Sequence, residues 1–177
     1  MIDNAVELPL ALCALIQSQL NLTADRGWIY NQKQDIPTDD GLFFSVACLR
    51  DKPFASSLDY ENVPATETAP AKLQEVQSIN TQETYRIMLF SRDASARQRR
   101  HEMVFVMHST AAQQLQERYS CRFGYIPLQM TDISAIEGAA RINRYSLTFS
   151  LTRAYTRTKP IEYFDTFTIP PTLIIEP

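Results

Sequence analysis

The stretch "RYSLTFSLTRAYTRT", Arg144 to Thr158, alternates between apolar and hydroxyl-bearing residues. Four apolar residues share one parity: Tyr145, Leu147, Phe149 and Leu151. Four hydroxyl residues share the other: Ser146, Thr148, Ser150 and Thr152. Because side chains on a strand point alternately to opposite faces, this pattern predicts a strand with one face on a core and the other in water.

The length of this stretch predicts that part of the strand projects past the core. At roughly 3.3 Å per residue it would span about 50 Å, well beyond the usual five or six residues of a globular strand. Arg153 takes the position where the apolar parity requires another hydrophobe, and from there the sequence "RAYTRTK" becomes basic. We expect this end to face a partner, with a solvated basic tip as the alternative.

Composition predicts one soluble domain. The chain has 177 residues, of which 45% are hydrophobic and 21% charged, enough to bury a sizeable core. The net charge of -3 argues against DNA binding by the protein as a whole and leaves only local patches as candidates. We expect residues 1–159 to form a single domain and residues 160–177 to form a proline-rich tail that docks on this domain or on a neighbour.

No segment is typical of a membrane protein or a secreted protein. The longest apolar run, Leu8 to Ile16, is too short to span a bilayer. Asp3 and Glu7 stand where a signal peptide needs positive charge. We therefore expect a protein made and kept in a cytoplasm, with no membrane partner. The cysteines Cys13, Cys48 and Cys121 are widely spaced and favour neither a disulfide framework nor a metal site.

The first half of the chain predicts a helix followed by a hairpin. Leu8–Leu22 has apolar residues at helical spacing, with Pro9 in the first turn. Strands starting at Gly27 and Gly41 are separated by "DIPTDDG", whose residues favour turns, so we expect them to form a hairpin. Residues 51–70 contain three prolines and no clear period, which predicts a loop with at most an extended piece at "SLDYENV".

The second half predicts strands around a pair of helices. A strand over Glu83–Ser91 is expected to extend back toward Ala71, and a helix should follow within "RDASARQRRHEMVFVMHS", capped by Ser91 or Asp93. A short helix should then run from a capping box at Thr110 to Tyr119. The segment "GYIPLQMTDIS" predicts an edge strand interrupted by Pro127. Together these elements predict an α+β fold with a mostly antiparallel sheet and helices packed on one face.

Motifs for catalysis, cofactors or metals are not evident in the sequence. The four glycines form no phosphate-binding loop motif. His101 and His108 share a helical face but have no third ligand at useful spacing, so we expect no metal site. Cys121 with His108 as a base has no supporting motif. We therefore expect no enzyme activity, no catalytic residues and no cofactor.

The strongest local charge is the segment "RDASARQRRH". It contains four arginines, and two more follow in the long strand, so the candidate contacts to a subunit or to a DNA backbone are Arg92, Arg97, Arg99, Arg100, Arg153 and Arg157. A solvated face, acidic groups of a neighbouring subunit and a nucleic acid backbone are the three alternatives. A small nucleic-acid-binding module based on Arg92–Arg100 is the alternative function.

The succession of elements over about residues 8–157 resembles the tail terminator, or neck terminator, proteins of long-tailed bacteriophages. The similar segments are an opening amphipathic helix, the strands "GWIYNQKQDIP" and "FFSVACLRDKPF", the strand, corner and helix "TYRIMLFSRDASARQRRHEMVFVMHST", and the closing strands "YIPLQMTDIS" and "RINRYSLTFSLTRAY". Each motif is degenerate, so the resemblance rests on their order and spacing.

This resemblance implies a structural protein of the virion neck that is assembled in the host cytoplasm. Its subunits would form a ring, expected to be a homohexamer, that caps the tail tube protein, ends tail growth and joins the tail to the head-completion or connector protein. Genomic DNA would pass through the ring during ejection. The family has no catalytic residues to transfer to this chain.

Overall fold

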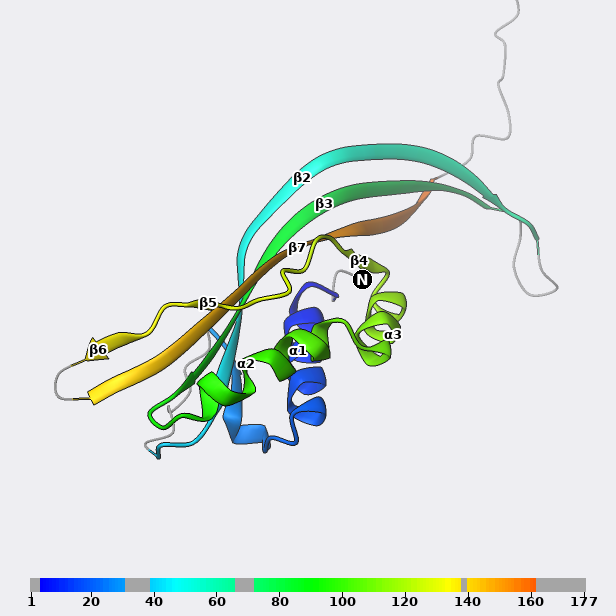
Figure 1. Ribbon diagram of the computed structural model, residues 1–177. Helices are drawn as coiled ribbons and strands as arrows, with labels where there is room; N and C mark the ends of the chain where they lie inside the picture. Colours follow the sequence, from blue (N-terminus) through cyan, green and yellow to red (C-terminus); the bar gives the residue numbers. More distant parts are fainter. Residues whose placement is uncertain (1–3, 31–38, 66–71, 138–139, 162–177) are drawn as a thin grey trace, which may run out of the picture. The chain divides into compact units, whose positions relative to one another are not determined.

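The structure, a computed structural model, describes residues 4–30, 39–65, 72–137 and 140–161 (Figure 1). Its elements in chain order are α1 (Asn4–Gln19), a 3-10 helix (Ala24–Arg26), β1 (Gly27–Ile29), β2 (Phe43–Val63), β3 (Lys72–Ser91), α2 (Ser95–Met107), α3 (Thr110–Arg118), β4 (Cys121–Phe123), β5 (Thr131–Asp132), β6 (Ala135–Glu137) and β7 (Ala140–Ile161). The strand order is β1-β2-β3-β7-β4, and both β5 and β6 pair with β7. The predicted α+β class with a mostly antiparallel sheet is confirmed.

Contacts along the chain divide it into two compact units. The first comprises Met1–Ser56 and Ile79–Tyr155, and the second comprises Ser57–Ser78 and Thr156–Pro177. This division differs from the predicted division into residues 1–159 and 160–177, because β2, β3 and β7 each contribute residues to both units. The predicted docking of the tail concerns residues 162–177, which lie outside the described residues.

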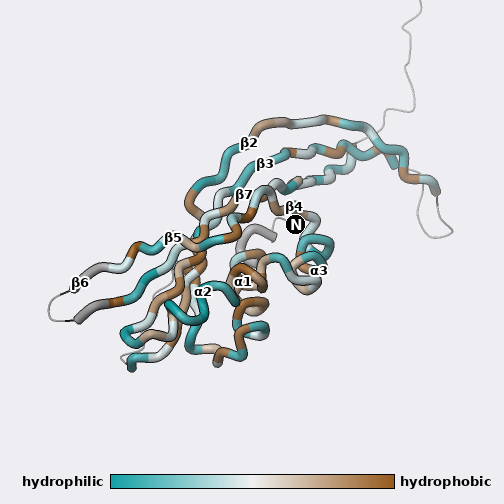
Figure 2. Tube along the Cα trace, in the orientation of Figure 1, coloured by the Kyte–Doolittle hydropathy of each residue, from teal (hydrophilic) through white to brown (hydrophobic). Residues whose placement is uncertain are grey.

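The core of the first unit lies between the sheet and the helices. The parity of the long strand is confirmed, since Tyr145, Leu147, Phe149 and Leu151 of β7 are all buried. They join apolar residues of the neighbouring strands and helices, among them Phe44, Val46, Tyr85, Ile87, Leu89, Leu12, Ile16, Met103 and Met107. Figure 2 shows apolar stretches, in brown, where the strands pass over α1 and α2. Each such side chain contributes about 1.5–3 kcal/mol when fully buried.

A second apolar cluster lies on the opposite face of the same sheet. Phe43 and Phe90 differ in parity from the core residues Phe44 and Leu89, and successive strand residues point to opposite faces. Their rings lie 4.6 Å apart, and the Trp28 ring lies 5.5 Å from Phe43 and 5.2 Å from Phe90. This aromatic cluster joins β1, β2 and β3 on the face that the helices leave uncovered.

The predicted hairpin between the first two strands is wrong. β1 pairs with β2 in parallel, with Gly27 opposite Phe44 and Ile29 opposite Val46. A parallel pair cannot be joined by a tight turn. Of the residues of "DIPTDDG" that the structure describes, Asp39 binds Arg26 at 2.6 Å and accepts a bond from the Gly41 amide at 2.8 Å.

The predicted loop over residues 51–70 is wrong for residues 51–56, whereas the extended piece predicted at "SLDYENV" is confirmed, since β2 continues to Val63. Its residues from Cys48 to Val63 are all exposed, so neither face of the strand is buried here. The sequence of this part therefore does not need the apolar alternation by which a half-buried strand is predicted. Pairing with β3 keeps them extended, and the expected backward extension of β3 to Lys72 is confirmed. Tertiary pairing here outweighs local propensity.

The helices start at residues close to those predicted. α1 begins at Asn4, so Pro9 lies inside the helix and not in its first turn as expected. For α2, both predicted caps contribute: Asp93 accepts a bond from the Ser95 amide at 2.8 Å, and the Ser91 hydroxyl accepts one from Ala96 at 3.0 Å. The first turn therefore has partners for two of its free amides.

Two further predicted boundaries differ from those in the structure. The cap of α3 is Ser109 and not Thr110, because the Ser109 hydroxyl accepts a bond from the Ala112 amide at 3.2 Å. In the predicted strand "GYIPLQMTDIS" only Thr131–Asp132 is a strand. The regular pairing is instead made by β4, whose residues Cys121–Phe123 lie antiparallel to Leu151–Arg153 of β7.

Candidate functional site

The predicted arginine cluster does not act as one basic surface. Arg92 and Arg97 are exposed, whereas Arg99 and Arg100 are half-buried. The Arg99 guanidinium binds Glu102 at 2.8 Å and donates to the Leu20 carbonyl at 2.7 Å, which ties α2 to the end of α1. Arg100 lies 5.4 Å from the centre of the Tyr145 ring. Arg99 and Arg100 are therefore engaged within the chain, and these contacts compensate part of the positive charge near the start of α2.

Arg153, which the sequence predicted to face a partner, is buried in the structure. It is only 4% exposed, so in the single chain it offers little surface to a partner. The parity that brings Leu151 into the core also brings Arg153 to the inner face of β7. Of the predicted residues in this strand, Arg157 is exposed.

Buried polar residues of β3 and β7 form a network around the Glu83 carboxyl group. The Tyr155 hydroxyl donates to Glu83 Oε1 at 2.7 Å, and the Tyr85 hydroxyl donates to Oε2 at 2.9 Å. Thr81 contributes a longer bond of 3.4 Å. The guanidinium of Arg153 lies 4.9 Å from the centre of the Tyr155 ring and donates to its hydroxyl at 3.5 Å. Thus the buried Glu83 carboxyl group and the buried Arg153 guanidinium lie at one end of the core and are connected through the Tyr155 hydroxyl.

The pKa values of the two tyrosines follow from this environment. Burial, the hydrogen bond to Glu83 and the charge of Glu83 raise the pKa of Tyr155 to about 12. Burial and the same acid also raise the pKa of Tyr85. Both hydroxyls therefore stay protonated and act as donors.

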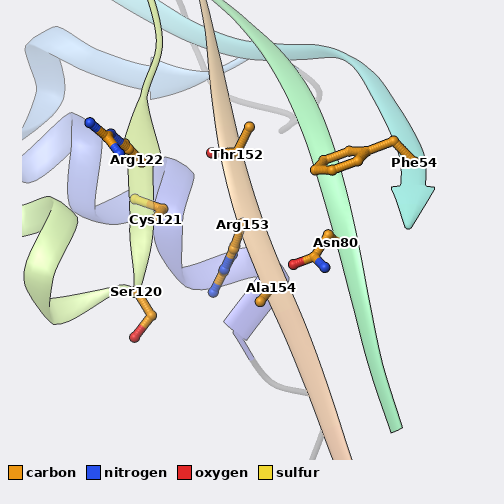
Figure 3. Close-up of a pocket in the computed structure, with 8 residues that line it drawn as sticks. All are labelled: Phe54, Asn80, Ser120, Cys121, Arg122, Thr152, Arg153 and Ala154. Atoms are coloured by element: carbon orange, nitrogen blue, oxygen red, sulfur yellow. The ribbon is translucent and has the colours of Figure 1, made fainter. Parts of the chain in front are cut away.

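An open depression of about 330 Å³ adjoins this network (Figure 3). Strands β2, β3, β4 and β7 supply its lining, with Phe54, Asn80, Cys121 and Arg153 among the residues. In Figure 3 the Arg122 side chain points away from β7. Burial raises the pKa of the Cys121 thiol to about 11, so the thiolate required for a nucleophile is disfavoured at neutral pH.

Sequence reasoning missed the buried Glu83. The signal was present, because Thr81 and Glu83 have the same parity in β3 as Tyr85, Ile87 and Leu89. A polar residue at a strand position whose neighbours of the same parity are apolar is expected to be buried with a polar partner. The same argument applied to Arg153 of β7 would have placed the two residues on the inner face of one sheet.

The comparisons with known proteins add no relative. A scan against models of protein families and a search of curated proteins found no match for this chain. None of the helices in the described part of the chain has the length and apolar character needed to cross a membrane.

Alkaline pH should weaken the fold through Tyr155. A tyrosine in the unfolded chain has a pKa of about 10, and that of Tyr155 in the folded chain is raised to about 12. The stability that this group contributes is complete below pH 10 and is lost as the pH rises through the folded value. Melting followed by circular dichroism between pH 8 and pH 12 should show a fall in Tm that is shallower for Tyr155→Phe. The exposed Tyr125→Phe is the control, and equal slopes for wild type and Tyr155→Phe would contradict the assignment.

Proposed function

We propose that this chain is a structural subunit of the neck of a long-tailed bacteriophage virion. Its copies form a ring, most simply a homohexamer, that caps the tail tube, ends tail growth and joins the tail to the head connector. This is the function implied by the resemblance of residues 8–157 to tail terminator proteins. It requires several surfaces that are complete only in the assembly.

The observation that supports this proposal best is the exposed part of β2. All of its residues from Cys48 to Val63 are exposed, including the large side chains of Leu58 and Tyr60. An exposed strand edge with apolar side chains promotes association with another chain, so monomeric proteins usually cover or shorten such edges. A subunit whose exposed edge is buried on assembly does not need to cover or shorten that edge.

The alternative function, a nucleic-acid-binding module, has less support. It requires Arg92, Arg97, Arg99 and Arg100 to reach a phosphate backbone together, and the contacts of Arg99 and Arg100 lie within the chain. If it were correct, DNA binding would fall steeply between about 50 and 200 mM salt.

Mass photometry of the purified chain over a range of concentrations tests the proposed function. We expect a discrete oligomer, with six copies as the first expectation, and rings in negative-stain images. A Leu58→Asp, Tyr60→Asp double variant is the matched control. Since both side chains are exposed, it should keep its circular dichroism spectrum and melting temperature at low concentration while losing the oligomer.

Monomers at every concentration, both alone and in the presence of tail tube and connector proteins, would contradict the proposal. So would an oligomer that the double variant forms as readily as wild type, because assembly would then not depend on the exposed part of β2.

A further inference from the structure

The second unit contains a short sheet with two unpaired edges. Its described residues are Ser57–Val63 of β2, the stretch 72–78 of β3 and Thr156–Ile161 of β7, with β3 in the middle. β1 pairs with β2 only at residues 44–46, and β4, β5 and β6 pair with β7 only at or before Arg153. In the described part of the chain, the outer edges of Ser57–Val63 and Thr156–Ile161 therefore have no strand beside them.

These two edges differ in how well they are protected against pairing. Proteins protect edge strands with proline, lysine, bulges or a covering element. The β2 segment "SLDYENV" contains no proline and no lysine, so every backbone amide that faces the outer edge keeps its hydrogen. On β7, Pro160 lacks an amide hydrogen and limits the usable edge to Thr156–Lys159.

The edges also carry opposite charge. The β2 segment has Asp59 and Glu61, and the β7 segment has Arg157 and Lys159, and all four residues are exposed. Two β2 edges together would bring four acidic side chains close to one another, and two β7 edges would bring four basic ones. A β2 edge beside a β7 edge avoids both repulsions and leaves the contact balanced in charge, so electrostatics disfavours contact between like edges and permits contact between unlike edges.

We propose that the β2 edge at Ser57–Val63 of one copy pairs with the β7 edge at Thr156–Lys159 of the next copy. This inference rests on the proposed function, and it identifies the surface through which the ring closes. Pairing satisfies backbone groups on both edges and gives Leu58 and Tyr60 a neighbouring strand to pack against. A contact between two different patches repeats from copy to copy, so it builds a closed ring or an open filament, and a symmetric dimer is not expected.

Charge reversal tests the pairing. Two variants are needed: Asp59→Lys with Glu61→Lys, which makes both edges basic, and Arg157→Glu with Lys159→Glu, which makes both edges acidic. Each alone should lose the oligomer at concentrations where wild type is assembled. Mixed in equal amounts they should assemble again, because each basic edge then meets an acidic one. Glu117→Lys, at an exposed position of α3, is the control and should assemble like wild type.

Cysteine pairs give a second, independent readout. In a Cys48→Ser background, Thr158→Cys is combined in turn with a cysteine at each position from 57 to 63, which covers both faces of the β2 segment, and the oligomer is oxidised. Within one chain, strands two places apart in a sheet are about 9.6 Å from each other, too far for a disulfide. At least one pair should therefore give a ladder of linked copies, whereas each single cysteine should not.

The outcomes separate the two proposals. An oligomer that forms in both charge-reversed variants, or a dimer linked through a single cysteine on β2, overturns the edge pairing and leaves the ring function standing. Monomers under all conditions, for wild type as well, overturn both. Each variant is first checked by thermal melting, since Glu61 accepts a bond from Gln74 at 3.0 Å within its own chain.

Discussion

Phe149→Ala is expected to lower the free energy of unfolding by about 3–5 kcal/mol. The side chain is only 2% exposed, and its ring lies 6.0 Å from that of Tyr85 and 5.3 Å from that of Phe123. These partners belong to the strands on either side of β7, which are fixed by backbone hydrogen bonds, so they cannot move in to fill the space. The loss therefore combines the transfer of the ring with the energy of a residual cavity. Chemical denaturation followed by circular dichroism measures it.

The matched control for this prediction is Phe105→Ala in α2. The same atoms are removed, but Phe105 is 72% exposed, so the change should stay within about 0.5 kcal/mol. If Phe149→Ala does not fold, the buried Ile87→Val should still lose about 0.5–1.5 kcal/mol. Equal stabilities of the Phe149 and Phe105 variants, compared in the same oligomeric state, would show that the core is not where the parity of β7 places it.

The parts of the fold that the sequence predicts are those where local pattern and tertiary packing agree. In β7 the apolar parity coincides with the face that is buried, so the strand can be found from Tyr145 to Leu151 alone. In β2 the pattern ends at Ala47, and beyond it only pairing with β3 maintains the strand. No periodicity of a single segment carries information about such a long-range pairing, which explains why this part was predicted as a loop.

The same distinction between local pattern and long-range contact applies to the candidate site. The sequence locates the basic residues but not their partners, since Arg99 and Arg100 meet groups of α1 and β7 that are distant along the chain. The burial of Arg153 was not predicted, because a charge at a position of apolar parity has two explanations, an exposed end or a buried partner. Deciding between them requires knowing that Glu83 has the same parity on the adjacent strand.

Glu83→Ala is expected to lower the free energy of unfolding by about 3 kcal/mol, even though the residue is polar. The carboxyl group accepts bonds from Tyr155 at 2.7 Å and from Tyr85 at 2.9 Å, and it is 3% exposed. Removing it leaves two hydroxyl donors without their acceptor, and each buried unsatisfied donor costs about 1–3 kcal/mol. Because Tyr155 also lies against Arg153, the positive charge on β7 loses a nearby acidic group at the same time.

A thermodynamic cycle with the tyrosines distinguishes this network from simple packing. If the hydroxyls are the origin of the loss, adding Tyr85→Phe and Tyr155→Phe to Glu83→Ala should cost much less than the same two changes in wild type, giving a coupling energy above about 0.5 kcal/mol. Additive losses would contradict the network. Glu117→Ala is the control, because it removes an exposed acid on α3 and is expected to change stability by less than about 0.5 kcal/mol. A loss for Glu83→Ala no larger than that of this control would also contradict the network. Since this network lies in the first unit, its disruption should lower stability in every oligomeric state, whereas the charge reversals in the second unit should change assembly alone.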